Sequence, residues 1–147
     1  MDLDFSTNLN HINQAKIIFK NKNIDCVYGS RLNSNSKVFN RSFIRTMTSK
    51  IYNYILRKYF EIDSTDAACG FKFFTKKYFY AIKNYSVSDG WFFTSELVII
   101  GKVLNYNLIE LPVFWKDDPN SKVKLLNLSI EYLKNMLSLK KKLMQDD

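Results

Sequence analysis

The sequence contains few of the residues that build covalent or metal-bound scaffolds. Among its 147 residues there are two cysteines and one histidine. Cys26 and Cys69 are too few for a disulfide framework and lack the paired spacing of a zinc site, so we expect both thiols to be reduced. His11 lies apart from the motifs described below, and we expect it at the surface or as a helix cap.

Long hydrophobic runs are also missing. The longest apolar stretch, residues 97–104, is interrupted by Gly101 and Lys102. It is far shorter than the roughly 20 residues that a membrane-spanning helix needs. The N-terminal residues Met1 to Asp4 do not form a basic run leading into an apolar segment, so no secretory signal is expected there. These absences predict a cytoplasmic location.

The remaining composition is that of an ordinary globular protein. Of all residues, 46% are hydrophobic and 24% are charged, which excludes intrinsic disorder. A length of 147 residues leaves room for one domain, and no repeat or low-complexity linker divides it.

Acidic residues are scarce in the middle of the chain. The whole sequence has 22 Lys and Arg against 14 Asp and Glu, a net charge of +8. Residues 31–77 alone hold ten basic and three acidic residues, which is +7 of that total. Such a block indicates a phosphate-bearing partner, whether nucleic acid, anionic lipid or nucleotide.

Hydrophobic periodicity predicts alternating helices and strands. Helices are expected from Thr7 or Asn8 to about Asn21 and over residues 41–60, 75–84, 92–104 and 124–143. Strands are expected over residues 24–28, 70–74 and 108–115, with a polar loop over residues 33–40. Pro112 indicates an edge position or a bulge, because proline cannot donate a hydrogen bond to a ladder. The alternation is typical of an α/β fold.

Two of the expected helices carry an apolar stripe. The stripe in residues 41–60 consists of Ile44, Met47, Ile51 and Ile55, and that in residues 124–143 of Leu126, Ile130, Leu133 and Leu137. The C-terminal helix ends in three lysines, residues 140–142. We expect its stripe either to pack on the domain or, together with these lysines, to lie on an anionic membrane surface.

Seven short motifs follow one another along the chain. They are Met1-Asp2-Leu3-Asp4, Gly29-Ser30-Arg31, Arg41 with Arg45, DAACGFKFF at residues 66–74, DGWFFTSEL at 89–97, IELPVFW at 109–115 and Ser121-Lys122. An Asp-x-Asp pair places two hard oxygen ligands on one divalent cation. A guanidinium group binds phosphate oxygens through a fork of donors. Alone, the pair of Asp2 and Asp4 is more often a charged terminus or a capping segment.

In this order and at these separations, the motifs resemble the catalytic domain of the family 2 glycosyltransferases that attach a sugar to a polyprenyl phosphate. The resemblance is to the dolichyl-phosphate glucosyltransferase and dolichyl-phosphate mannose synthase type, and it spans roughly residues 1–140. It implies a GT-A fold and inverting transfer of a hexose from a nucleotide sugar, UDP-glucose or GDP-mannose, to a polyprenyl phosphate. It also implies Mg²⁺ or Mn²⁺ as cofactor and a peripheral position on the cytoplasmic face of a membrane.

The resemblance further implies roles for individual residues. Asp2 and Asp4 match metal ligands, and the residues that match phosphate-binding positions are Arg31, Arg41, Arg45, Lys72 and Lys122. Asp66 and Glu96 are the candidate catalytic residues, and Gly29, Ser30, Gly70 and Trp91 are expected to position the substrate. The resemblance implies that Glu96 acts either as a base or only in positioning the substrate. A lipid phosphate is already anionic at pH 7, so strong base catalysis is not required.

Purely structural explanations compete with several of these roles. Arg31 is alternatively a solvated loop arginine, and Arg41 and Arg45 alternatively mark an exposed helix face. Asp66 is alternatively a hydrogen-bonded turn carboxylate, and Lys122 a solvated lysine.

The departure from the family lies at the N-terminus. In the family, the Asp-x-Asp motif follows a first half that supplies the opening βαβ units and the pocket for the nucleotide base, whereas here it begins at residue 2. We therefore expect residues 1–147 to be a partial family 2 domain, with a C-terminal amphipathic helix over residues 124–143. A longer reading frame, a separate chain that supplies the first half, or a decayed gene would each explain this, and the isolated chain is expected to be marginally stable or oligomeric.

Two other functions are compatible with parts of the sequence. The basic block and 16% aromatic residues suit a nucleic-acid binding module, although no binding motif supports it, and nucleic acid is not the expected partner. A catalytically incomplete fragment that serves as an assembly partner would differ from the transferase only in failing to bind the donor.

Overall fold

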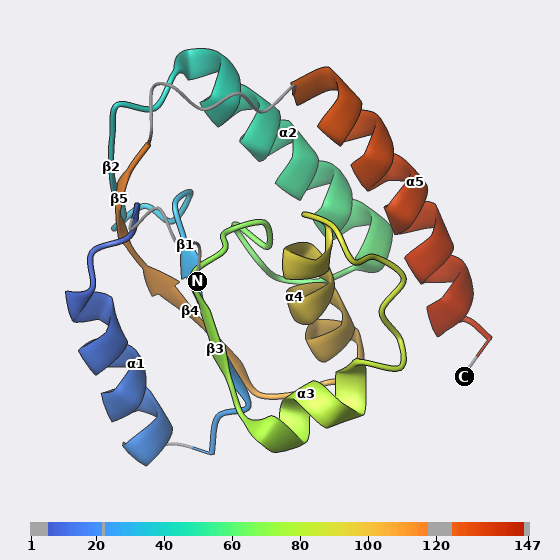
Figure 1. Cartoon of the computed structure of the whole chain (residues 1–147), viewed down its shortest axis with the longest axis horizontal. Coiled ribbons are helices and arrows are strands. Elements are labelled where there is room, and N and C mark those ends of the chain that lie inside the picture. The colour runs from blue at the N-terminus through green and yellow to red at the C-terminus, as the bar shows by residue number, and fades with distance from the viewer. Residues whose placement is uncertain (1–5, 22, 118–124, 146–147) are drawn as a thin grey trace.

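The chain folds into a small α/β structure, as the alternation predicts. The computed structural model describes residues 6–21, 23–117 and 125–145 (Figure 1). Its helices are α1 (Asn10–Asn21), α2 (Phe43–Phe60), α3 (Lys76–Ile82), α4 (Phe93–Val103) and α5 (Leu125–Leu143). Its strands are β1 (Cys26–Ser30), β2 (Lys37–Phe39), β3 (Lys72–Phe74), β4 (Leu108–Pro112) and β5 (Phe114–Lys116).

The described strands form two small sheets. In the first sheet β1 is central, antiparallel to β3 and parallel to β4. In the second sheet β2 pairs with β5 in parallel. Pro112 is the last residue of β4, an edge strand among the described residues, which confirms the edge position expected for this proline.

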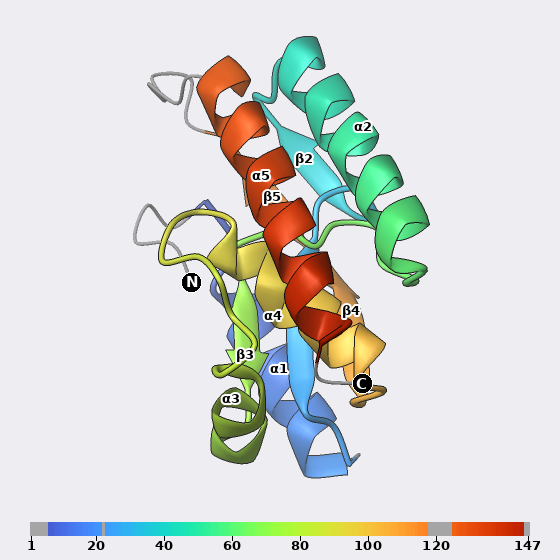
Figure 2. The ribbon, with the colours of Figure 1, turned by 90° about the vertical axis from the view of Figure 1, so that its right-hand side faces the viewer.

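The main core lies between the first sheet, α4 and the two long helices. All seven residues from Ser95 to Gly101 in α4 are buried. Leu56 and Phe60 of α2 pack in the same cluster as Met136 and Leu139 of α5. Figures 1 and 2 show α2 and α5 side by side, and the Tyr52 and Tyr132 rings join them with centroids 5.0 Å apart.

Three local predictions differ from the structure. The first strand lies two residues later than expected and continues through Gly29 to Ser30. The expected polar loop over residues 33–40 contains β2, whose three residues become a strand only by pairing with β5. The expected strand over residues 108–115 divides at Val113, so that β4 and β5 belong to different sheets.

The apolar stripe of α2 faces away from the core. Ile44 is 67% exposed and Ile51 is 54% exposed, whereas the buried positions of this helix are Asn53, Leu56 and Phe60. Helix α2 is therefore apolar on two opposite sides.

Helix α5 repeats this arrangement. Ile130 and Leu137 are 56% and 62% exposed, and Tyr132, Met136 and Leu139 make its contact with the core. Of the two alternatives for the predicted stripe, packing on the domain is therefore wrong for Ile130, Leu133 and Leu137, and the side chain of Leu126 lies outside the described part. None of the helices in the described part of the chain has the length and hydropathy of a membrane span.

Gly29 generates a first testable prediction. A Cβ atom added at this position would lie 2.9 Å from Val113 Cγ1, 3.2 Å from Phe71 Cβ and 3.3 Å from Cys69 Sγ. Because all three neighbours are buried, we expect Gly29→Ala to lower the free energy of unfolding by about 1 to 3 kcal/mol, measured by urea denaturation.

Gly90→Ala is the matched control. There the added atom would lie 2.9 Å from Glu131 Oε1, the end of an exposed side chain that is able to move. We expect a change within about 0.5 kcal/mol. Equal effects at the two glycines would contradict close packing around Gly29.

Candidate functional site

The candidate site lies where parallel strands end. Ser30 of β1 is paired with Pro112 of β4, so both strands finish at one edge of the first sheet. Ligands of α/β proteins bind outside such carboxyl ends. Arg31 follows β1 directly, Arg41 comes two residues after β2, and Asp117 follows β5 directly.

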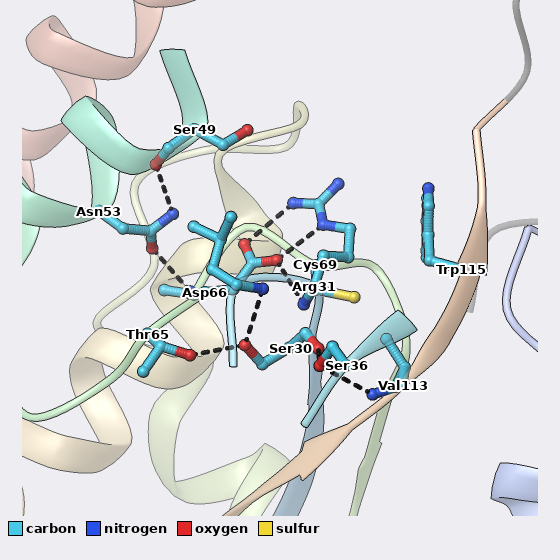
Figure 3. A network of polar contacts seen from close by, with 12 residues as sticks. Ser30, Arg31, Ser36, Ser49, Asn53, Thr65, Asp66, Cys69, Val113 and Trp115 are labelled. Atoms are coloured by element: carbon cyan, nitrogen blue, oxygen red, sulfur yellow. Dashed lines mark hydrogen bonds and ion pairs between the residues drawn. The ribbon is translucent and has the colours of Figure 1, made fainter. Parts of the chain in front are cut away.

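Arg31 forms a buried ion pair with Asp66. Its Nε atom lies 2.7 Å from Asp66 Oδ2, its Nη2 atom donates to Oδ1 at 2.9 Å, and its backbone N–H donates to Oδ2 at 3.0 Å (Figure 3). Asp66 is fully buried. Burial acts to raise the pKa of this carboxyl, but the Arg31 guanidinium and its hydrogen bonds hold the pKa below the ordinary value.

The loop that carries Asp66 is fastened from two sides. Asn53 of α2 is buried; its Oδ1 accepts from the Ala67 N–H at 2.9 Å, and its amide donates to the Ser49 carbonyl at 2.9 Å (Figure 3). The Lys72 ammonium group donates to the carbonyl oxygens of Ala67, at 3.0 Å, and Cys69. Lys72, predicted to bind phosphate, is thus directed at this loop and is 7% exposed.

Glu110 of β4 joins the loop that follows β1, through Asn33, to the loop before Asp66, through Thr65. Its carboxylate accepts from the Thr65 N–H at 2.8 Å, from the Thr65 hydroxyl, from the Tyr28 hydroxyl at 3.1 Å and from the Asn33 amide at 3.2 Å. Ser30, predicted to position the substrate, shares this support, because its hydroxyl contacts Thr65 Oγ1 at 2.6 Å. Sequence reasoning assigned no role to Glu110.

Arg41 and Arg45 converge on Asp117. Arg41 Nη1 donates to Asp117 Oδ1 at 3.1 Å, and Arg45 Nη1 donates to Oδ2 at 3.2 Å. Arg41 also donates to Ser49 Oγ at 2.7 Å. Arg41 precedes α2, whose N-cap is Ser42, so the two arginines come together through Asp117 rather than by four-residue helical spacing alone.

Trp115 connects the Arg31–Asp66 ion pair to the two ion pairs of Asp117. The Arg31 Cζ atom lies 5.1 Å from the centre of the Trp115 ring, and the Trp115 indole N–H donates to Asp117 Oδ1 at 2.8 Å. We call the set Arg31, Arg41, Arg45, Asp66 and Asp117 the arginine cluster. Three positive charges face two negative charges within it, so its own groups leave one net positive charge.

Two other predicted residues lie outside the cluster's hydrogen bonds. Glu96, in the first turn of α4, is buried and accepts from the Ser86 hydroxyl and, at 2.9 Å, from the Val87 N–H. Burial raises the pKa of its carboxyl. Trp91 precedes α4 and is 58% exposed.

Gly29 packs against Val113 and Phe71 rather than opening space beside a ligand. Gly70 is half-buried in the loop before β3.

The predicted metal ligands Asp2 and Asp4 lie outside the described residues, as do Ser121 and Lys122. Within the part of the chain that is described, no group of three His, Cys, Asp or Glu side chains is placed to hold a metal ion. The described chain begins at Ser6, two residues after Asp4, and the Ser6 carbonyl accepts from the Lys116 N–H at 2.8 Å, directly before Asp117.

His11 corrects a sequence prediction. It is 8% exposed rather than at the surface, and its Nε2 atom accepts from the Phe114 N–H at 2.9 Å. Because Nε2 accepts, the proton is on Nδ1, which contacts Gln14 Oε1. His11 thus fastens α1 to β5, a contact between residues 103 positions apart that local periodicity does not reveal.

Comparison with known proteins identifies relatives but no matching family model. The chain is 27% identical over 125 residues to "Glycosyltransferase AglD" of Haloferax volcanii, a match that covers 85% of this chain and 20% of AglD. It is 25% identical over 145 residues to "Dolichyl-phosphate beta-glucosyltransferase" of Dictyostelium discoideum, covering 95% of this chain and 44% of that protein. The protein of the same name from Saccharomyces cerevisiae is 29% identical over 75 residues, which is 51% of this chain and 22% of the relative. The chain thus spans less than half the length of each of these curated relatives.

The buried ion pair generates a second prediction. Asp66→Asn leaves the Arg31 charge buried without its partner, so we expect the free energy of unfolding at pH 7 to fall by about 3 to 5 kcal/mol. Asp63→Asn, at an exposed carboxylate nearby in the sequence, should change it by less than about 0.5 kcal/mol. Urea denaturation measures both, and a loss below about 1 kcal/mol for Asp66→Asn would contradict the importance of the pair.

The pH dependence follows from the same carboxyl. The pKa of Asp66 is lower in the folded than in the unfolded chain, so the folded chain binds fewer protons. Its contribution to stability is therefore present above the ordinary value of 3.8 and is lost as the pH falls through the lower folded pKa. Wild type and Asp63→Asn should lose stability in parallel over this range, as followed by urea denaturation at successive pH values.

Proposed function

We propose that this chain, a distant homologue of glycosyltransferases, is the acceptor-side part of an enzyme that transfers a hexose from a nucleotide-diphosphate sugar to a polyprenyl phosphate. The proposal includes inversion at the anomeric carbon and a GT-A fold for the complete enzyme. The observation that carries it is the arginine cluster, in which three guanidinium groups from different segments converge at the carboxyl ends of parallel strands. The names of the two dolichyl-phosphate beta-glucosyltransferases support this choice of acceptor.

The chemistry of such a transfer suits this cluster. A phosphate oxygen of the acceptor attacks the anomeric carbon, and the bond from that carbon to the nucleoside diphosphate breaks. Negative charge is present on the acceptor and develops on the departing diphosphate, so fixed guanidinium groups stabilise the transition state. The attacking oxygen is already ionised at pH 7, so no strong base is required. Glu96, buried against Ser86 and Val87, fits a supporting role better than that of a base.

Asp66 is proposed to act through Arg31. Its two carboxylate oxygens fix both the side chain and the backbone N–H of Arg31. A guanidinium held in this way needs little rearrangement when a phosphate arrives. Asp66 is therefore a positioning residue in this proposal.

A divalent cation at Asp2 and Asp4 remains part of the proposal. Mg²⁺ or Mn²⁺ bound there would offset charge on the departing nucleoside diphosphate. The bond from Ser6 to Lys116 supports this placement, because it brings the described chain next to Asp117 two residues after Asp4. The exposed ring of Trp91 is available to stack on the sugar. The names of the two beta-glucosyltransferases support glucose from UDP-glucose over mannose from GDP-mannose.

The exposed stripe of α2 supports a lipid rather than a nucleic-acid partner. Arg45 lies in the first turn of α2, and Ile44, Met47 and Ile51 continue from there along its solvent-facing side. A phosphate bound by the arginines would thus lie at the start of an apolar surface. An apolar face with nearby cations favours peripheral binding to an anionic membrane.

Transfer activity tests the proposal directly. We expect Arg45→Gln to reduce hexose transfer from UDP-glucose or GDP-mannose to a polyprenyl phosphate, in the presence of Mn²⁺, by about tenfold or more, because a charge-assisted hydrogen bond to phosphate is lost. Lys50→Gln, which removes an exposed cation from the same helix, is the matched control and should leave transfer unchanged. Radiolabelled sugar in the lipid phase measures the reaction.

The same assay separates the alternatives. Substituting both Asp2 and Asp4 by Ala should abolish the response to Mn²⁺. The assay uses the chain together with the first half of the domain, which supplies the nucleotide pocket. Absence of transfer with either donor in this complete enzyme would contradict the proposal and favour an assembly partner. Salt-sensitive binding to generic DNA or RNA without any response to Mn²⁺ would favour a nucleic-acid module.

Membrane binding tests the role of the α2 stripe. We expect the double substitution Ile44→Asp and Ile51→Asp to reduce co-sedimentation with vesicles containing phosphatidylglycerol by at least about tenfold, since it places two carboxylates on the apolar face. Ile17→Asp is the control, because Ile17 is 57% exposed on α1. Equal losses for both variants, or no binding by the wild type, would contradict a membrane role for α2.

A further inference from the structure

The two aspartates of the arginine cluster hold their arginines differently. Asp66 is fully buried and directs both oxygens to one residue, with bonds to Arg31 Nε, Nη2 and backbone N–H. Asp117 divides its oxygens between Arg41 and Arg45, with one bond to each, at 3.1 and 3.2 Å. Asp66 thus holds Arg31 through several bonds at once, whereas Asp117 holds Arg41 and Arg45 through one hydrogen bond to each.

Asp117 has an anchor that does not involve an arginine. The Trp115 indole N–H donates to its Oδ1 at 2.8 Å, and its own backbone N–H donates to the Phe39 carbonyl at 3.0 Å. The carboxylate can therefore release one or both guanidinium groups and still keep a hydrogen-bond donor. The equivalent movement of Asp66 would leave Arg31 with a buried, unpaired charge.

Arg41 retains unused binding capacity. Its side chain is 10% exposed, and its Nε–H has no hydrogen-bond partner among the described residues. Its Nη atoms bind Asp117, Ser49 and the Arg45 carbonyl. A buried donor without a partner costs free energy, and an anion that reaches Nε would remove this cost.

Asp117 carries a negative charge at neutral pH. Burial acts to raise its pKa, but the Trp115 hydrogen bond and the charges of Arg41 and Arg45 hold the pKa below its ordinary value. An arriving phosphate group therefore meets an anion already bound to the guanidinium groups that it needs. The two anions compete for the same donors.

From this geometry we infer that Asp117 is an internal substitute for a phosphate group, which occupies Arg41 and Arg45 until a phosphate of the substrate displaces it. This inference rests on the proposed function. It makes Asp117 a determinant of phosphate affinity: the carboxylate keeps the two arginines together and at the same time weakens anion binding. Arg31, held by Asp66, is the fixed part of the cluster.

Neutralising Asp117 is the central test. Asp117→Asn keeps the size of the side chain and an oxygen that accepts from Trp115, but it removes the competing charge. We expect the variant to bind inorganic phosphate or pyrophosphate at least about tenfold more tightly than wild type, measured by isothermal titration calorimetry at constant salt. Phosphate represents the monoester of a lipid acceptor and pyrophosphate the diphosphate of a nucleotide, so the larger gain identifies which group displaces Asp117.

Asp63→Asn is the matched control. It removes one exposed carboxylate and so changes net charge equally, and it should alter either affinity by less than about twofold. In a double variant, Arg45→Gln should cancel most of the gain caused by Asp117→Asn, because both act on the same bond. Unchanged or weaker anion binding by a folded Asp117→Asn variant would overturn the inference and leave Asp117 as a positioning residue alone.

A measurement on the wild type avoids dependence on the variant's stability. The chain has two tryptophans, so its NMR spectrum has two indole N–H signals, assigned with Trp91→Phe. Pyrophosphate should shift the Trp115 signal, because Trp115 donates to Asp117, and leave the exposed Trp91 signal in place. Binding without a shift of the Trp115 signal would contradict the displacement.

These results can be separated from those on the proposed function. Tighter anion binding by Asp117→Asn without hexose transfer by the complete enzyme would retain the displacement and reject the transferase. Transfer by the wild type with no gain in anion affinity for Asp117→Asn would retain the transferase and reject the displacement.

Discussion

The Arg31–Asp66 ion pair is the interaction on which the rest of the candidate site depends. Removing two charges from water is costly, and this cost is offset only when the geometry is good and the remaining hydrogen-bonding atoms are satisfied. Here both carboxylate oxygens are bonded, and the same aspartate also accepts from the Arg31 backbone N–H. The pair therefore fixes the end of β1 relative to the loop that begins at Asp66. Asn53 of α2 and Lys72 of β3 hold the same loop, so β1, α2 and β3 are all joined through it.

The surrounding packing keeps this geometry from relaxing. Gly29, two residues before Arg31, has no room for a methyl group beside Val113 and Phe71. Trp115 lies against the Arg31 guanidinium and donates to Asp117, which links the Arg31–Asp66 pair to the contacts of Arg41 and Arg45. Three arginines would repel one another if they were held together without carboxylates. The two aspartates thus make the convergence of positive charge possible, and they leave a net positive charge for an anion.

Local sequence patterns revealed the elements but not their partners. Helices α2, α3 and α4 were predicted to within about two residues because their hydrophobic spacing is local. Strand β2 was missed because three residues in a polar segment form a strand only through pairing with β5. The solvent exposure of Ile44 and Ile51 was not predictable, since α2 has apolar side chains on two sides and periodicity does not tell which side meets the core.

In the candidate site, too, the sequence predicted individual residues but not the contacts between them. Sequence motifs selected Arg31, Arg41, Arg45 and Asp66 as site residues. They did not predict that Arg31 pairs with Asp66, because the two residues lie 35 positions apart. Asp117 and Glu110 were missed because the arginine partners of Asp117 and the Thr65 partner of Glu110 lie more than 40 positions away.

The exposed stripe of α2 gains a functional interpretation only from its position beside the arginine cluster, which neither periodicity nor the motifs indicate. A ligand with an anionic head and a long apolar tail needs cations at the border of an apolar surface, and Arg45 in the first turn of α2 lies at such a border. A nucleic acid would place charge along the whole contact, and there the isoleucines of α2 would contribute little. The arrangement of charge beside apolar surface therefore favours an amphiphilic phosphate more strongly than the total charge of the chain does.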